Sequence, residues 1–158
     1  MEVSVGQAGE PVFEAVNPDF AANVHESFAR HGMNATIGAS LTAVEAGRVH
    51  IRLPFSPQLT QQNGYLHAGA IATIADNACG YAALSLAPAG TDVVAAEFKV
   101  NLLAPARAGM FEARARVLRP GRTLTVVQAD VFGIEGDTQE LVATMIETVF
   151  VKNRRRTP

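Results

Sequence analysis

The residue in this chain best suited to chemistry is a single carboxylate, Asp76. It lies in a segment made mostly of Ala, Ile and Gly, and no Lys or Arg occurs within one helical turn of it. Burying a charged group without a partner is costly, so an isolated acid among small apolar residues calls for a functional explanation. A side chain of this kind can act as a general base or as a nucleophile.

The loop before this segment offers the complementary chemistry. Residues 61–67 are mostly polar, contain Gly64, and lead directly into the segment that carries Asp76. If that segment is helical, its first backbone N–H groups lack partners within the helix, and the helix dipole is positive there. Such an end can bind a carbonyl oxygen or an anion. An acid and an oxyanion donor together are the minimal equipment for hydrolysis by acyl transfer.

The element that positions both groups is predicted to be one long helix. Apolar residues fall on one stripe at helical spacing from about Ala68 to Leu86, and Pro88 and Gly90 follow where a helix would end. A different face, which carries Asp76, is built almost entirely from small residues. Small side chains let another backbone or a ligand approach this face closely.

Alternating apolar and polar residues predict strands on both sides of this helix. Val49, Ile51 and Leu53 are separated by polar residues, which is the period of a half-buried strand. The predicted elements are a short helix at 20–30 that stops near residue 32, and strands at 36–45, 48–55, 94–102, 111–118, 123–132 and 141–151. Because the helix is very apolar and the sheet needs one face covered, the two should pack together. We expect an α+β fold, an antiparallel sheet of about six strands wrapped around one long central helix.

Length and composition predict one domain with two appendages. The 158 residues are enough for one buried core. We expect a flexible N-terminal arm at residues 1–17, a single domain at 18–152 and a basic C-terminal tail at 153–158, which contains Arg154, Arg155 and Arg156.

The charge and the cysteine content exclude several classes of protein. A net charge of −2 argues against a general nucleic-acid binder, whose surface is strongly basic. The single Cys79 allows neither an intramolecular disulfide nor a cysteine metal cluster, and it favours a reducing compartment. The N-terminus lacks a signal-peptide pattern, and no apolar run approaches the ~18 residues that span a bilayer. We therefore expect a cytoplasmic protein with no nucleic-acid and no membrane partner.

The loop and the helix also carry a recognisable motif. Gly64, His67, Gly69 and Asp76 stand as G-x-x-H-A-G followed by I-A-D-N-A, and this resembles the motif of hotdog-fold thioesterases, in particular the PaaI-like acyl-CoA thioesterases. Further matches are residues 101–106 after the helix and residues 121–124 at the start of a later strand. The resemblance implies hydrolysis of an acyl-CoA thioester to a free acid and CoA. It implies neither a metal nor a cofactor, because CoA is part of the substrate.

The resemblance also assigns roles to individual residues. Asp76 would be the general base or the nucleophile, and the backbone N–H of Ala68 or Gly69 would form the oxyanion hole. His67 would orient the loop through its ring nitrogens. The substrate-binding candidates are Gln61, Asn63, Gly64, Arg107 and Arg122, of which the two arginines would meet the phosphates of CoA.

The chain departs from the family pattern at three points. Ala68 stands where the family usually has Gly, which an alanine with negative φ can replace if only the backbone N–H acts. Gln61 stands where the family often has Asn. Many relatives hold a water with a Ser or Thr on the strand after the helix, but residues 94–96 here contain no hydroxyl.

Helix geometry predicts that the active site is shared between two chains. His67 and Asp76 are nine residues apart, so on one helix they lie about half a turn out of phase and ~13 Å apart along the axis. They cannot converge on one substrate carbonyl from the same helix. A two-fold interface that places the loop of one subunit opposite Asp76 of the other resolves this conflict. We expect a homodimer or a homotetramer with active sites at the dimer interface.

Two other functions remain open at this stage. A hotdog enoyl-CoA hydratase or dehydratase would need an acid and a His close together in one pocket, which the spacing of His67 and Asp76 opposes. A non-catalytic acyl-CoA-binding hotdog protein is the other alternative, and the isolated acid opposite a helix N-terminus argues against it.

Overall fold

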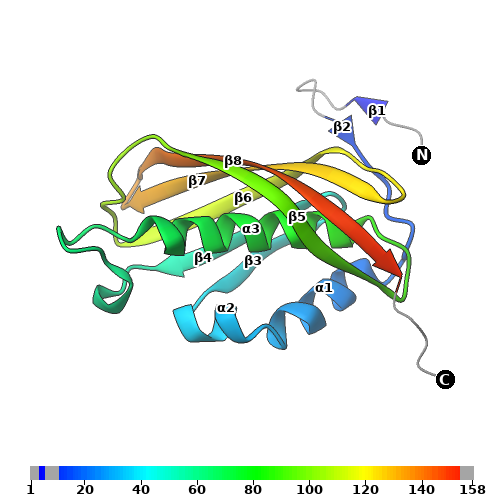
Figure 1. Cartoon of the computed structure of the whole chain (residues 1–158), viewed down its shortest axis with the longest axis horizontal. Helices are drawn as coiled ribbons and strands as arrows, with labels where there is room; N and C mark the ends of the chain where they lie inside the picture. Colours follow the sequence, from blue (N-terminus) through cyan, green and yellow to red (C-terminus); the bar gives the residue numbers. More distant parts are fainter. Residues whose placement is uncertain (1–3, 6–10, 154–158) are drawn as a thin grey trace.

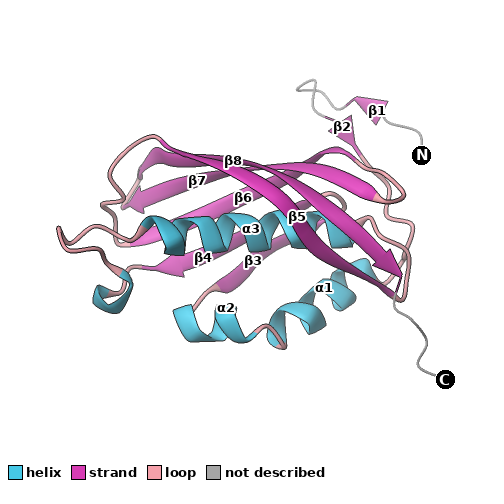
Figure 2. Ribbon diagram, viewed as in Figure 1, coloured by secondary structure: helices cyan, strands magenta, loops and turns pink. Residues whose placement is uncertain are grey.

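The computed structural model describes residues 4–5 and 11–153 of the chain (Figures 1 and 2). The helices are α1 (Phe20–Ala29), α2 (Gly32–Ile37) and α3 (Ala68–Ser85), with a 3₁₀ turn at Pro57–Leu59. The main sheet contains β3 (Ser40–Glu45), β4 (Arg48–Pro54), β5 (Thr91–Leu102), β6 (Met110–Arg119), β7 (Leu124–Glu135) and β8 (Thr138–Asn153). A small separate ribbon pairs β1 (Ser4–Val5) with β2 (Pro11–Val12). The basic residues 154–156 lie outside the described residues.

The six strands form one antiparallel sheet around α3. Their order is β3-β4-β6-β7-β8-β5, and β5, which follows α3 in the chain, returns to pair with β8 at one edge. Figure 1 shows α3 running along the middle of the molecule, with α1 and α2 beside it near β3. The helix contacts all six strands, and α1 contacts both α3 and β3. The predicted fold class is therefore confirmed.

The core lies between α3 and the inner face of the sheet. Twelve of the eighteen residues of α3 are buried, including Ile71, Ile74 and Ala78. A helix this apolar is stable only when other elements cover most of its circumference, and the curled sheet provides that cover. The predicted alternation in β4 is also present, since Val49 and Ile51 are fully buried on its inner side.

The C-terminal end of α3 is tied to the turn between β3 and β4. The buried hydroxyl of Ser85 donates to the carbonyl of Ala82 (2.7 Å) and accepts from the backbone N–H of Gly47 (2.8 Å). Gly47 has φ of +77°, and a Cβ there would lie 2.9 Å from Cδ2 of Phe13. Phe13 is 6% exposed and belongs to the core. One side chain of the predicted N-terminal arm thus packs against the domain.

The structure corrects the boundary of the first predicted strand. Residues 36 and 37 do not begin a strand but end the helix α2, and β3 starts only at Ser40. Two β-branched residues, Thr36 and Ile37, favour a strand locally. Gly38, with φ of +75°, closes the helix instead, because its N–H bonds to the carbonyl of Ala35. Ile37 is buried when this segment is helical. Packing against the core therefore outweighs the local preference for a strand.

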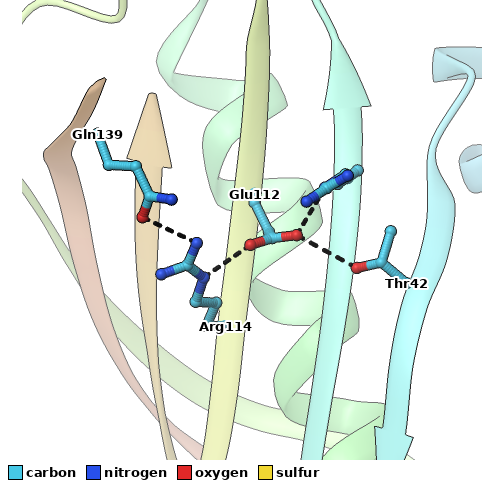
Figure 3. A network of polar contacts seen from close by, with 5 residues as sticks. Thr42, Glu112, Arg114 and Gln139 are labelled. Carbon is cyan, nitrogen blue, oxygen red and sulfur yellow. Dashed lines mark hydrogen bonds and ion pairs between the residues drawn. The ribbon is translucent and has the colours of Figure 1, made fainter. Parts of the chain in front are cut away.

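The outer face of the sheet carries a polar network that joins several strands (Figure 3). The buried carboxylate of Glu112 accepts from Nε of Arg52 and from Nε of Arg114, both at 2.7 Å, and from Thr42 at 3.3 Å. Arg114 also donates to Gln139 (2.9 Å). Burial raises the pKa of Glu112, but the hydrogen bonds and charges of the two arginines outweigh burial and hold it below its usual value. The network links β3, β4, β6 and β8 on the side opposite α3.

Candidate active site

The start of α3 is fixed by the side chain of His67. This residue is the N-cap, with φ of −65° and ψ of 140°, and its Nδ1 accepts a hydrogen bond from the backbone N–H of Gly69 (2.8 Å). The acceptor role of Nδ1 places the proton of a neutral ring on Nε2. A Cβ on Gly69 would lie 3.0 Å from Nδ1, so the glycine allows the close approach of the ring. The position of His67 supports the orienting role that the family resemblance implies.

The N–H of Ala68 is the free donor at this helix end. Gly69 already donates to His67, and the N–H groups of Ala70 and Ile71 reach the carbonyl of His67. Within the described residues Ala68 donates no hydrogen bond, and its φ is negative because no residue other than glycine has a positive φ. Ala68 therefore presents an unpaired N–H at the positive end of α3 without backbone strain.

The loop before α3 is a closed turn held by its own polar groups. The backbone N–H of Gln61 donates to the carbonyl of Tyr65 (2.9 Å), and Gly64, with φ of +81°, donates back to the carbonyl of Gln61 (3.0 Å). The side chain of Gln61 accepts from the N–H of Asn63. Arg107 donates to the hydroxyl of Tyr65 and lies over its ring, 4.3 Å from the centroid.

Gln61 and Ala68 line one hollow, which we call the Ala68 hollow. It has a volume of about 340 Å³, and its wall also includes Tyr65 and Leu102, the last residue of β5. The remaining wall is largely apolar. The free N–H and the predicted substrate-binding loop therefore share one recess at one end of the molecule.

Asp76 lines a different hollow of about 460 Å³, the Asp76 hollow. Its carboxyl group is half-buried and makes no hydrogen bond or ion pair within the described part of the chain. Burial raises the pKa of Asp76, and the nearby His31 lowers it to a smaller extent. A raised pKa makes the carboxylate a stronger proton acceptor. The Asp76 and Ala68 hollows share no lining residue.

Arg122, the second arginine predicted to bind CoA, lines neither the Ala68 hollow nor the Asp76 hollow. Arg122 lines a hollow of about 700 Å³ together with Phe150 and Lys152. Lys152 also lines the Asp76 hollow, so these two recesses adjoin. Within one chain the structure thus groups Gln61 with Ala68, and it leaves Asp76 and Arg122 apart from them.

Three side chains of the Asp76 hollow escaped the sequence analysis: His31, Tyr81 and Glu147. His31 lies between α1 and α2, so its contact with the Asp76 region is purely tertiary, whereas Tyr81 lies on the same helix as Asp76. Glu147 did leave a signal. It stands at the inward parity of β8, between the buried Met145 and Val149, where a carboxylate breaks the alternation of a half-buried strand.

The described residues contain no group of three or more His, Cys, Asp or Glu side chains that could hold a metal ion. They contain no helix that is both long and apolar enough to cross a bilayer. Cys79 is fully buried in the core, and burial raises its pKa well above the usual value. The Asp76 carboxylate and the backbone N–H at the start of α3 remain the candidate groups for chemistry.

An antiparallel six-stranded sheet wrapped around one long helix defines a hotdog-fold protein. The model of the thioesterase superfamily matches residues 63–140, which include the loop, α3 and most of the sheet that follows. A solved thioesterase family protein from Silicibacter pomeroyi is 43% identical, with a TM-score of 0.83 over 85% of this chain and 98% of that chain. The chain belongs to the thioesterase superfamily and is a thioester hydrolase.

Other relatives agree with this assignment. The 1,4-dihydroxy-2-naphthoyl-CoA hydrolase of Listeria monocytogenes is 28% identical over 125 residues, which span 79% of this chain and 99% of that enzyme. The E. coli PaaI protein from the phenylacetic acid degradation operon is 20% identical, with a TM-score of 0.77 over 86% of this chain and 95% of that chain, and shows the same fold. A relative from Saccharolobus solfataricus is 36% identical over 93 residues, and this chain spans 66% of its length.

Proposed function

We propose that the protein hydrolyses an acyl-CoA thioester to a free acid and CoA, with Asp76 as the catalytic carboxylate and the N–H of Ala68 as the oxyanion donor. The observation that carries this proposal is the unbonded, half-buried Asp76 carboxylate with its raised pKa. The Listeria relative, named as a hydrolase of a CoA thioester, supports CoA as the thiol component.

The chemistry needs only these two groups. Asp76 accepts a proton from a water molecule as that water attacks the thioester carbonyl carbon. The carbonyl oxygen becomes an oxyanion, which the N–H of Ala68 and the helix dipole stabilise. The tetrahedral intermediate then expels the CoA thiolate, and the proton held by Asp76 passes to the sulfur. In the nucleophilic variant Asp76 attacks the carbonyl carbon itself, and the C–S bond breaks to release the CoA thiolate, which takes a proton from solvent. Water then hydrolyses the resulting anhydride to the free acid and restores the Asp76 carboxylate.

The site forms between two copies of the chain in this proposal. The strand β5 is a free edge of the sheet, and it carries Val94, Phe98 and Leu102 with 54%, 45% and 56% of their surface exposed. Val94, near the start of β5, lines the Asp76 hollow, and Leu102 at its end lines the Ala68 hollow. A two-fold axis near Phe98 would pair two β5 strands antiparallel. It would place the Asp76 hollow of one copy beside the Ala68 hollow of the other.

The cations near these recesses suit the phosphates of CoA. Arg107 lies beside the Ala68 hollow through its contact with Tyr65, and Arg122 and Lys152 line the recess that adjoins the Asp76 hollow. All three of these residues are exposed, so they can reach an anionic ligand without a desolvation cost comparable to that of a buried charge.

An acyl-CoA hydrolysis assay tests the proposal directly. CoA release from a panel of acyl-CoAs is followed with a thiol reagent for the wild type and for Asp76→Asn, which should lower kcat by at least ~10²-fold. Asp137→Asn is the matched control, because Asp137 is exposed in the turn between β7 and β8 and lines none of the three hollows. Near-normal turnover by a folded Asp76→Asn protein would remove Asp76 from the mechanism.

One observation favours hydration of an enoyl-CoA as the second candidate. His31 and Asp76 line the same hollow and interact electrostatically, so an acid and an imidazole do lie near each other, although not the His67 considered from the sequence. Incubation with an α,β-unsaturated acyl-CoA separates the two functions. A hydratase consumes the conjugated double bond without releasing CoA, whereas the thioesterase releases CoA.

A further inference from the structure

Gly80 is a residue of α3 that the packing of one chain does not explain. Glycine destabilises a helix interior relative to alanine, and α3 uses alanine at most of its other small positions. The second glycine of this helix, Gly69, has a reason, because a Cβ there would lie 3.0 Å from Nδ1 of His67. A Cβ on Gly80 would meet no atom within 4 Å beyond its chain neighbours and the backbone of its own helix. Alanine would therefore fit, and the glycine calls for an occupant from outside the chain.

The open space beside Gly80 is the Asp76 hollow. Five residues of α3 line this hollow: Asp76, Asn77, Gly80, Tyr81 and Leu84. Their spacing places them on one continuous face of the helix, which extends ~12 Å along the axis from Asp76 to Leu84. Gly80 lies midway along this face and contributes no side chain to it. A chain-like ligand that reaches Asp76 can therefore extend over Gly80 toward Leu84.

The hollow leads from Asp76 to a pair of cations. Lys152 lines the hollow and also lines the adjoining recess that contains Arg122, and Leu86 at the end of α3 bounds that recess. Besides Asp76 and Lys152, the polar side chains that line the hollow are Ser27, His31, Asn77, Tyr81, Asp92 and Glu147. The arm of CoA contains amide and hydroxyl groups and ends in phosphates. A polar trough that ends near Lys and Arg side chains suits such an arm.

The Ala68 hollow has the opposite character. Most of its wall is apolar and consists of Leu66, Ile71, Leu102, Ala104, Pro105 and Val142. Arg107, the cation beside it, already donates to the hydroxyl of Tyr65 and lies over its ring. Amide groups buried against an apolar wall would lose hydrogen bonds to water, whereas an acyl group would lose none. The two hollows therefore suit different ends of one acyl-CoA molecule.

We propose that the arm of CoA lies in the Asp76 hollow, over Gly80 and toward Lys152, and that Gly80 keeps this route open. The acyl group then points the other way, into the Ala68 hollow of the second copy. The inference rests on the proposed thioesterase function and adds the orientation of the substrate. Because alanine at this position would favour the helix and narrow the route, helix stability and CoA binding should change in opposite directions.

Free CoA tests the route, because it contains the arm and no acyl group. Its Kd is measured by titration calorimetry for the wild type, Gly80→Ala and Gly80→Leu. Gly80→Ala should raise the melting temperature by ~2–4 °C and yet weaken CoA binding a few-fold. Gly80→Leu should weaken it by at least ~10-fold. Gly32→Ala is the matched control, because Gly32 is a helix residue with equally open surroundings that lines none of the three hollows, and it should leave the Kd unchanged.

Kinetics separate an arm route from an acyl pocket. The values of kcat/KM are measured for butyryl-CoA and decanoyl-CoA. Gly80→Leu should lower both alike and leave their ratio unchanged. Ala104→Leu narrows the Ala68 hollow, so it should lower the ratio of decanoyl to butyryl and leave the Kd of CoA unchanged. A Gly80→Leu protein that alters the ratio would place the acyl group over Gly80 and overturn the inference.

Three other results would also overturn it. The first is a folded Gly80→Leu protein with the wild-type Kd for CoA, or an unchanged Kd in Gly80→Ala if the leucine variant does not fold. The second is dissociation of the Gly80→Leu dimer in size-exclusion chromatography, because the second copy would then be the occupant. The third is an active wild type that binds no CoA. A wild type that hydrolyses no acyl-CoA but binds CoA in a manner sensitive to Gly80 would instead remove the proposed function and retain the route.

Discussion

Replacing Ala68 by proline removes one hydrogen atom from the site and little else. Ala68 is the first residue of α3, and its N–H is unpaired within the described residues, so proline breaks no hydrogen bond there. Its φ is negative, and proline is well tolerated at the first helical position. The preceding His67 has ψ of 140°, which is the extended conformation that a residue before proline prefers. The fold should therefore accept Ala68→Pro with a small change in stability.

The catalytic effect should be large by comparison. The loss of a single oxyanion donor lowers kcat by roughly 10²–10³-fold in comparable enzymes, or about 3–4 kcal/mol of transition-state stabilisation. Gly69 cannot substitute, because its N–H already donates to Nδ1 of His67 at 2.8 Å. The KM should change much less than kcat, since the missing interaction strengthens only as negative charge develops on the carbonyl oxygen.

The assay compares the wild type, Ala68→Pro and Ala68→Gly. Steady-state release of CoA gives kcat and KM, and circular dichroism melts report the folded state. Ala68→Gly keeps the donor and restores the residue usual in related sequences, so it should stay within a few-fold of the wild type. A folded Ala68→Pro protein with wild-type kcat would move the oxyanion site elsewhere and refute the assignment of Ala68.

Three further outcomes are expected. Co-expressed Asp76→Ala and Ala68→Pro subunits, each inactive as a homodimer, should form heterodimers with roughly half the wild-type activity, because one of two shared sites is intact; inactive heterodimers would contradict a site across the interface. Because the folded pKa of Glu147 is raised from 4.5 to about 9, the folded chain keeps a proton that the unfolded chain releases between these values. Stability should fall as pH rises through this window, by up to about 1.4 kcal/mol per pH unit. Urea unfolding at two pH values inside the window should show that Glu147→Gln removes this dependence, and an equal dependence in both proteins would exclude Glu147 as its source. Gly69→Ala should push the ring of His67 from its N-cap position and lower kcat and thermal stability together, whereas an unchanged enzyme would show that this close approach is dispensable.

The fold was largely predictable because its main signals are periodic. The apolar stripe predicted a helix from Ala68 to about Leu86, and the structure has it from Ala68 to Ser85. The alternating strands were recognised for the same reason. The helix α2 was missed because its end depends on Gly38 and on burial of Ile37, neither of which produces a repeat in the sequence. Phe13 was assigned to a free arm because its contact with Gly47 joins distant parts of the chain.

The candidate site was only partly predictable, for a related reason. Asp76 and Ala68 belong to one local motif, and their separation along one helix follows from helix geometry alone. Much of the polar lining of the Asp76 hollow comes instead from α1, from His31 between α1 and α2, and from β5 and β8, which meet α3 only in the folded chain. Glu147 could have been noticed as a carboxylate at the inward parity of its strand. Its proximity to Asp76 could not be predicted, because it depends on how the sheet packs against α3.

The two carboxyl groups of the hollow favour Asp76 over Glu147 as the proposed catalytic carboxylate. The helix α3 contacts β8, and Glu147 lies close enough to Asp76 for the charge of Asp76 to raise the pKa of Glu147. Glu147 is 1% exposed, and among the described residues no cation lowers its pKa, whereas Asp76 is half-buried and His31 lowers its pKa. Asp76 therefore ionises first, and its charge keeps Glu147 neutral. One packing arrangement thus separates the pKa values of two acids, which leaves a proton acceptor beside a hydrogen-bond donor in the same recess.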